Sequence, residues 1–166
     1  MSPFVLSQCI ASLSFALDLT AFHFRQRNTS LRLLALSTGL LALHFLLLEQ
    51  STAAGLMLLA AVRFLTATWS TRREWCGLFC ALAVIFSLVT WQMPRDVFPL
   101  AGSLLLTLAA FQPHQTTLRL FTALGSLCWL INNILAGSPV AVLMELAFMA
   151  STLISYFRLY KITDKI

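Results

Sequence analysis

The sequence predicts an all-α integral membrane protein with seven transmembrane helices in one membrane domain. Three observations lead to this fold class. Hydrophobic residues make up 59% of the 166 residues and charged residues only 10%, against about 25% charged residues in a typical soluble domain. The chain divides at its polar clusters into seven apolar segments, and two short motifs recur 87 residues apart. Together these features indicate a polytopic membrane protein with a duplicated bundle.

The seven apolar segments have lengths close to the ~17 to 25 residues that span a bilayer. The first has no basic region before its apolar run, so we expect a retained helix and not a cleaved signal peptide. The fifth is short, and its Pro99 fits the first turn of a helix. The connecting loops have only a few residues, so consecutive helices should be antiparallel. The predicted segments are Pro3–Phe24, Leu33–Leu48, Thr52–Trp69, Trp75–Trp91, Val97–Phe111, Leu118–Leu135 and Pro139–Tyr160.

The two recurring motifs predict an internal repeat. Leu31-Arg32-Leu33 recurs as Leu118-Arg119-Leu120, and Leu56-Met57 as Leu143-Met144. A shift of 87 residues superposes the first three segments on the last three. A three-helix unit ends on the opposite side of the membrane from where it began, so the fourth segment must bring the chain back. The sequence therefore predicts a 3+1+3 arrangement of parallel repeats, residues 1–73 and 94–166, with a connector at 74–93.

The distribution of Lys and Arg predicts the orientation, because cytoplasmic loops are enriched in these residues. Alternate loops collect nine basic residues on one side and only Arg95 on the other. This places the N-terminus outside and the C-terminus in the cytoplasm. The basic residues lie in short gaps between apolar runs, which argues against a nucleic-acid partner despite the net charge of +5. The nine are Arg25, Arg27, Arg32, Arg72, Arg73, Arg119, Arg158, Lys161 and Lys165.

Several stretches of the chain resemble a known family. Ala61-Val62-Arg63, Leu43-His44-Phe45-Leu46-Leu47, Cys128-Trp129-Leu130-Ile131-Asn132-Asn133 and Met144-Glu145 are similar to stretches of the YgjV family of bacterial inner-membrane proteins. That family is grouped with the MtN3-like superfamily of SWEET sugar carriers and PnuC vitamin-precursor transporters. The resemblance implies an inner-membrane location, the 3+1+3 fold and transport of a small solute. Asn132 stands where the family pattern has a His, and Asp18 where it has a small residue.

Two charged residues fall at membrane depth, where an unpaired charge costs about 2.5–3.5 kcal/mol on insertion scales. Arg63 lies about eleven residues into the third segment, or ~16 Å along the helix. Glu145 lies about seven residues into the last segment. Their levels differ by ~8 Å, a gap that the long Arg63 side chain can cover. An ion pair between them is feasible and would lock the two halves together. The alternative is that the two charges line a solute pathway.

The other polar candidates are uncharged, except Asp18. His44 lies near the middle of the second segment, and Asn132 and Asn133 lie toward the outer end of the sixth. With Trp129 one turn earlier, they offer amide hydrogen bonds beside an aromatic platform, which suits a neutral polar solute. The alternative is hydrogen bonding between helices. Asp18 either reaches the cytoplasmic interface or neutralises Arg25, and the alternative is that it acts as a proton-coupling acid.

The predicted function is a facilitator or carrier of a small polar solute, such as a sugar, a nucleoside or a vitamin precursor. The alternative is a non-transporting structural or regulatory membrane partner. No enzyme, cofactor or metal site is expected, because the sequence has no His-rich cluster, nucleophile motif or phosphate loop. The expected partners are the lipid bilayer and the solute, and the oligomeric state is open. A polar central cavity bordered by His44, Arg63, Asn132 and Glu145 would favour transport, whereas a centre packed by Leu and Phe would favour the partner role.

Overall fold

The computed structural model describes residues 2–21, 23–24, 26–70, 72–112 and 114–163, without the side chains of 115 and 155–163. Within these residues the chain forms seven α-helices and one short 3₁₀ helix, which confirms the all-helical prediction. The helices are α1 (Pro3–Ala21), α2 (Arg27–Leu47), α3 (Ser51–Trp69), α4 (Glu74–Thr90), η1 (Pro94–Asp96), α5 (Val97–Ala110), α6 (Gln115–Leu135) and α7 (Pro139–Thr163).

Four of these helices are long and apolar enough to cross a membrane: α1, α2, α3 and the stretch Thr116–Leu135 of α6. The helix α4 and the stretch Pro139–Ile154 of α7 are apolar but shorter. The helix α5 has 14 residues, or ~21 Å of length. The helix α2 begins six residues before its predicted segment, because its first turns are polar and hydropathy alone does not detect them.

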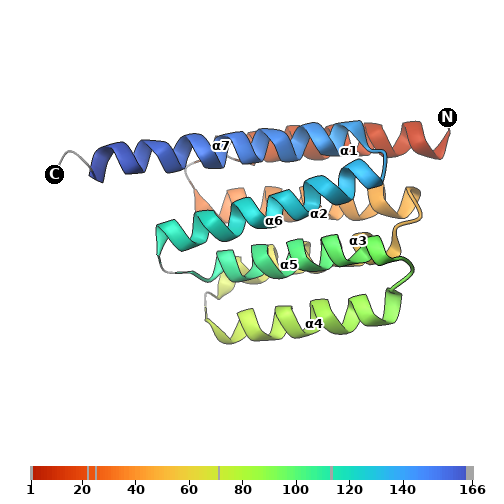
Figure 1. Ribbon diagram of the computed structural model, residues 1–166, viewed down its shortest axis with the longest axis horizontal. Coiled ribbons are helices and arrows are strands. Elements are labelled where there is room, and N and C mark those ends of the chain that lie inside the picture. Colours follow the sequence, from red (N-terminus) through yellow and green to blue (C-terminus); the bar gives the residue numbers. More distant parts are fainter. Residues whose placement is uncertain (1, 22, 25, 71, 113, 164–166) are drawn as a thin grey trace.

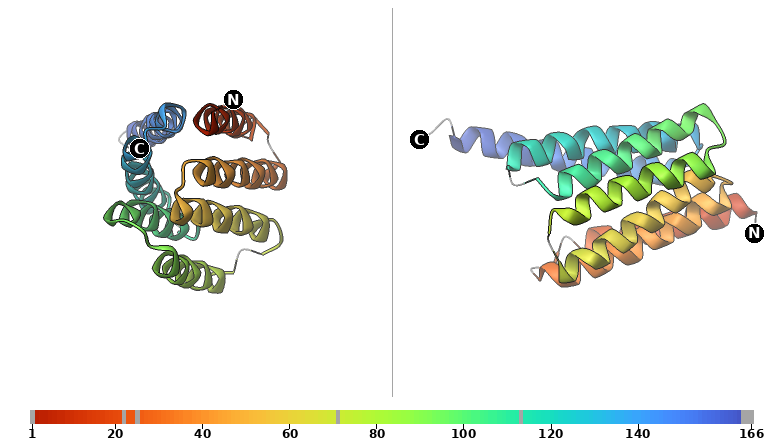
Figure 2. Two further views of the ribbon diagram at one scale, coloured as in Figure 1. Left: turned by 90° about the vertical axis from the view of Figure 1, so that its right-hand side faces the viewer. Right: turned by 90° about the horizontal axis from the view of Figure 1, so that it is seen from below.

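The helices pack as two groups of three with α4 at one side (Figures 1 and 2). In the first group α1 packs on α2 and α2 on α3, and in the second α5 packs on α6 and α6 on α7. The groups meet where α3 contacts α5 and where α1 contacts α7, and α4 contacts α3 and α5. The odd-numbered helices run in one direction along the bundle, so α1 begins at one end and α7 finishes at the other.

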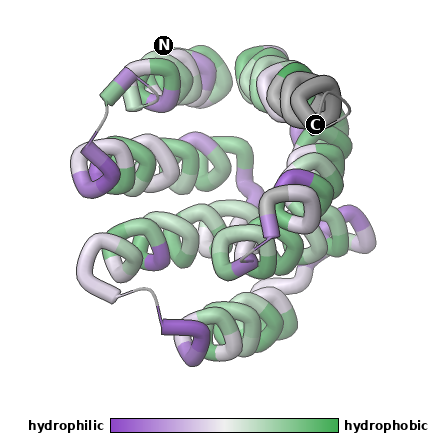
Figure 3. The backbone as a smooth tube through the Cα atoms, turned by 90° about the vertical axis from the view of Figure 1, so that its left-hand side faces the viewer, coloured by the Kyte–Doolittle hydropathy of each residue, from purple (hydrophilic) through white to green (hydrophobic). Residues whose placement is uncertain are grey.

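Large apolar side chains cover the outside of the bundle, and small residues fill much of its centre. Leu13, Leu58 and Val89 are 55%, 58% and 81% exposed, whereas Ala11 and Ala83 are fully buried. Hydrophilic residues gather at the helix ends (Figure 3). Apolar side chains facing outward and small residues at helix contacts are typical of proteins whose solvent is lipid.

The turn that ends α2 has the same geometry as the turn that ends α6. Glu49 has a φ of 57°, and the Gln50 N–H donates to a carbonyl five residues earlier over 2.9 Å. Gly137 has a φ of 67°, and the Ser138 N–H makes the same bond over 3.0 Å. A left-handed residue with this hydrogen bond is a common C-terminal helix motif.

These equivalent features are 88 residues apart. The helices α2 and α6 both have 21 residues and begin at Arg27 and Gln115, 88 residues later. The helices α3 and α7 begin at Ser51 and Pro139, again 88 residues apart. The starts of these helices are thus separated by one residue more than the 87 that separate the recurring motifs. In Leu-rich helices a short motif can recur by chance one residue away from the position that the helix boundaries make equivalent.

Small residues let the first two helices of each group cross closely. The Ser14 hydroxyl donates to the Ser37 carbonyl over 3.0 Å, and the Ser37 hydroxyl to the Ser14 carbonyl over 3.1 Å. The residues 88 positions later are Gly102 and Gly125, and a Cβ on Gly102 would lie 3.1 Å from the Gly125 carbonyl oxygen. The α1–α2 and α5–α6 contacts thus use small residues at the same positions.

A buried carboxylate, Asp96, holds the connection between α4 and α5. Its Oδ2 atom accepts the Gln92 N–H over 2.8 Å, the Met93 N–H over 3.1 Å and the Thr52 hydroxyl over 3.3 Å. Asp96 is 6% exposed. Since Thr52 lies in the first turn of α3, this one side chain ties the loop to the start of another helix.

Replacing Asp96 with asparagine should therefore destabilise the fold. Hydrogen bonds to a charged acceptor contribute about 1 kcal/mol more than neutral ones, so we expect a loss of about 1 kcal/mol in the free energy of unfolding. Thermal unfolding of the purified protein in detergent measures it. Glu49→Gln, at an exposed acid, is the matched control, and an equal change in both variants would contradict this role.

Candidate functional site

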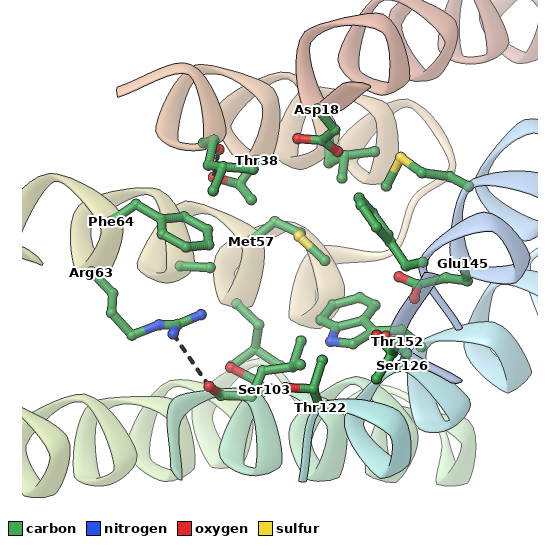
Figure 4. A pocket seen from close by; sticks show the side chains of 18 of the residues that line it. Asp18, Thr38, Met57, Arg63, Phe64, Ser103, Thr122, Ser126, Glu145 and Thr152 are labelled. Carbon is green, nitrogen blue, oxygen red and sulfur yellow. Dashed lines mark hydrogen bonds between the residues drawn. The ribbon is translucent and has the colours of Figure 1, made fainter. Parts of the chain in front are cut away.

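A cavity of about 410 Å³ lies between the two groups of helices. Its lining comes from α1, α2, α3, α5, α6 and α7, and is mostly apolar with a few polar and charged side chains (Figure 4). Four charged residues are part of the lining: Asp18, Arg63, Arg119 and Glu145. The centre of the protein is therefore a cavity that holds charges of both signs.

The two acids come from neighbouring helices, α1 and α7. Asp18 is 4% exposed and Glu145 is 6% exposed. The Ser37 hydroxyl lies near the Asp18 carboxylate, and the Ser126 hydroxyl lies near the Glu145 carboxylate. The charges of the two acids also act on each other. Asp18 thus faces the cavity, and among the described residues it forms no ion pair.

Arg63 lies on the opposite side of the cavity from Glu145, with Met57 between them (Figure 4). Its Nη1 atom donates to the Leu106 carbonyl over 3.4 Å, and its guanidinium lies 5.0 Å from the centre of the Phe64 ring. Of the two alternatives, the structure therefore does not show the ion pair between Arg63 and Glu145. The prediction matched the helix levels, but the Arg63 side chain extends toward α5 and not toward α7.

Arg119 is a cavity residue that the sequence analysis treated only as an orientation signal. It is partly buried, and its Nη1 atom is fully buried with no hydrogen-bond partner. Arg32, its match in the recurring motif, is exposed. The structural separation of 88 makes Arg119 equivalent to Leu31, and one residue turns a side chain by about 100° around a helix. Aligning α6 with α2 at a separation of 88 residues instead of 87 would have placed the Arg119 side chain at the cavity.

Trp129 also lines the cavity. Its side chain is 2% exposed, its ring centre lies 5.7 Å from that of Phe45, and its Nε1 atom is buried without a hydrogen-bond partner. An indole N–H is a donor only. The predicted aromatic platform therefore lies at the cavity, together with one N–H donor that has no acceptor among the residues the structure describes.

The other predicted polar residues lie outside the cavity lining, near the turns that end α2 and α6. The Nδ1 atom of His44 lies 2.9 Å from the Ser7 carbonyl oxygen, and its Nε2 atom lies 3.2 Å from the Ser138 hydroxyl. The Asn132 amide donates to Gln50 over 3.3 Å, and the Asn133 amide donates to the carbonyl of residue 141 over 3.4 Å. These bonds join helices, as in the alternative role considered for His44, Asn132 and Asn133.

The site has no evident metal-binding group. Within the described part of the chain, no three His, Cys, Asp or Glu side chains come together in a way that could hold a metal ion. Cys9, Cys76, Cys80 and Cys128 are free thiols. The chemistry available at the cavity is therefore that of carboxylates, guanidinium groups, hydroxyls and an indole N–H.

Comparison with known proteins agrees with this membrane architecture. Residues 5–163 match the sequence family Imp-YgjV, which is described as a bacterial inner membrane protein. The inner membrane protein YgjV of Escherichia coli (strain K12) is 26% identical over 166 residues, which cover 99% of this chain and 90% of the relative. No solved structure matches the chain. With a family match over almost its whole length, the chain belongs to the YgjV family of bacterial inner membrane proteins.

Proposed function

We propose that the chain consists of two three-helix repeats joined by α4, and that a small polar solute crosses the inner membrane through the cavity between them. The repeats are residues 1–73 and 94–166, with seven membrane spans in total. This is the arrangement of the MtN3-like carriers, with which the YgjV family is grouped. The proposal includes an outside N-terminus, since Arg27, Arg32, Arg72, Arg73 and Arg119 lie at one end of the bundle and Arg95 at the other.

The cavity lining supports the repeat. Nine pairs of lining residues are separated by 88 positions, the separation at which α2 and α6 begin. Equivalent positions of the two groups thus face each other across the cavity, as expected on a pseudo-twofold axis. The pairs are Asp18 with Leu106, Leu34 with Thr122, Thr38 with Ser126, Leu41 with Trp129, Leu56 with Met144, Met57 with Glu145, Ala60 with Phe148, Arg63 with Ser151, and Phe64 with Thr152.

Each charged residue of the lining has a neutral equivalent in the other half. The equivalents of Arg63 and Glu145 are Ser151 and Met57, and that of Asp18 is Leu106. Packing of the repeats does not need these charges, since the equivalent position is neutral in every case. Charges inside membranes are expensive and mark solute and ion pathways. The observation that carries the proposal is therefore a central cavity whose charges form no ion pair among the described residues.

The lining also favours one class of solute. Asn132 and Asn133, the amides expected to bind a neutral sugar, make hydrogen bonds between helices instead. The cavity instead offers the carboxylates of Asp18 and Glu145 and the guanidinium groups of Arg63 and Arg119. Arg63 lies on the opposite side from Glu145 (Figure 4). A solute with a cationic and an anionic group complements both sides at once. We therefore propose a small zwitterionic solute, with an aromatic or apolar part packed against Trp129.

Flux into proteoliposomes tests this function. The purified protein is reconstituted, and uptake of isotopically labelled neutral amino acids, which are zwitterions, is compared with uptake of labelled glucose. We expect amino-acid uptake above that of protein-free liposomes, and a fall of at least about tenfold in Glu145→Gln, which removes one charge contact. Glu74→Gln, at an exposed acid outside the cavity, should retain uptake. Absence of uptake would leave the non-transporting partner role. Equal uptake by Glu145→Gln and the wild type would contradict the role given to Glu145.

A further inference from the structure

A second cavity, of about 310 Å³, opens at the basic end of the bundle. It lies between the start of α2, the end of α3 and the end of α5. Arg27, Arg63 and Arg73 are part of its lining, together with Ser70 and Gln112. None of the described lining residues is acidic. The cavity therefore combines three positive charges with no negative charge of its own.

Arg63 forms the inner wall of this cavity, and it also lines the central one. It is 7% exposed, and its contacts are a long hydrogen bond to the Leu106 carbonyl and the face of Phe64. A guanidinium has five N–H donors. Among the described residues, no carboxylate forms an ion pair with it. A buried cation of this kind has donors and charge available for an anion.

The other two arginines lie at the open side of the cavity. Arg27 is exposed, and its Nη1 atom is held by the Ala67 carbonyl over 2.9 Å. Arg73 is exposed just before α4. The Ser70 hydroxyl oxygen accepts the Trp75 indole N–H over 3.1 Å, which leaves the hydroxyl proton for a ligand oxygen. The side chains of Arg27, Arg73 and Ser70 thus surround the mouth of the second cavity.

We propose that this basic cavity binds a phosphate group, with Arg63 at its floor and Arg27 and Arg73 at its mouth. Guanidinium groups bind phosphate oxygens in a bidentate manner, and several of them around one site match its charge. The phosphate comes either from an anionic lipid headgroup, because the cavity lies where the helices reach the membrane surface, or from a soluble phosphate compound. This site does not depend on transport through the central cavity.

Helix capping explains only part of the cluster. The helices α3 and α5 both end beside the cavity, and basic side chains stabilise the exposed carbonyls of a helix C-terminus. Arg27 caps α3 through Ala67. Arg73 lies at the start of α4, where a cation is not favoured by the helix dipole, and Arg63 is within α3. Capping therefore leaves two of the three arginines without a reason to face this space.

Thermal unfolding of the purified full-length protein in detergent tests the proposal. Inorganic phosphate is titrated against chloride at equal ionic strength, and phosphatidylglycerol is titrated against diacylglycerol, which lacks the phosphate. A ligand that binds only the folded state raises Tm as its concentration passes Kd. A rise with phosphatidylglycerol alone identifies a lipid headgroup, and a rise with inorganic phosphate identifies a soluble phosphate compound.

Variants locate the binding site. We expect Arg27→Gln/Arg73→Gln to weaken the effect at least tenfold, and Arg73→Gln alone to weaken it less. The matched control is Arg32→Gln/Arg95→Gln, which removes two arginines outside the cavity lining and should respond like the wild type. Native mass spectrometry counts bound phosphatidylglycerol independently of stability. The proposal is overturned if neither ligand raises Tm, or if the cavity variants respond as strongly as the control.

Discussion

Replacing Gly102 with alanine is expected to lower the stability of the protein. A Cβ at this position would lie 2.7 Å from Cδ1 of Trp129 and 3.1 Å from the Gly125 carbonyl oxygen. Trp129 is 2% exposed and packed against Phe45, so its ring has little room to move, and the carbonyl belongs to the backbone of α6. Overpacking of this kind costs about 1–3 kcal/mol. The midpoint of thermal unfolding in detergent should fall by several degrees.

Gly77→Ala provides the matched control for this prediction. Gly77 is also inside a helix, α4, but a Cβ there would meet no atom within 4 Å. Alanine is favoured over glycine in a helix by about 1 kcal/mol, so Gly77→Ala should be neutral or stabilising. The difference between the two variants isolates the close contact of α5 with α6. Equal stability of Gly102→Ala and Gly77→Ala would show that the helices can separate without loss.

The sequence predicted the helices well because hydrocarbon length is a strong constraint. Each predicted segment corresponds to one helix, and α3 differs from its segment by a single residue at its start. The boundaries failed where polar residues are helical, as in the first turn of α2, Arg27-Asn28-Thr29-Ser30. Hydropathy identifies the residues that can lie in the hydrocarbon of the membrane. A helix can continue beyond them into the polar interface as long as its backbone hydrogen bonds form, so hydropathy underestimates its length.

The candidate site was predicted only in part, because a cavity depends on the direction of each side chain. Depth along a helix placed Arg63 and Glu145 at the level of the membrane, and both side chains are buried at the central cavity. Direction around the helix depends on register, and an error of one residue rotates a position by about 100°. That error hid Arg119, which the recurring motif equated with the exposed Arg32.

The polar network near the turns shows a second limit. His44 and Asn132 are equivalent at a separation of 88, and both bind a residue of a neighbouring helix or turn. The sequence alone does not distinguish a buried His or Asn that binds a ligand from one that forms a hydrogen bond to another helix. Only the positions of Ser7 and Gln50 decided between the two. Those positions come from tertiary packing, which a single sequence does not show.

Arg63→Met and Glu145→Met should each leave the protein as stable as the wild type or more stable. Neither charge has an ionic partner among the described residues, and Met57, the equivalent of Glu145, shows that methionine fits the lining. An arginine at the centre of a membrane helix costs about 2.5–3.5 kcal/mol on insertion scales, so Arg63→Met should gain on the order of 1–3 kcal/mol. Thermal unfolding measured without phosphate or anionic lipid gives the value, since a bound anion would add stability to the wild type alone.

The double variant separates unpaired charges from a buried ion pair. For a pair, removing one partner strands the other and costs about 3–5 kcal/mol, and the second change recovers part of that loss. For separate charges on opposite sides of a cavity (Figure 4), the two effects should add within about 0.5 kcal/mol. Strong destabilisation by either single change, relieved in Arg63→Met/Glu145→Met, would contradict the separation seen in the structure. If instead the variants retain stability but lose solute uptake, the two charges serve solute transport and not the packing of the helices.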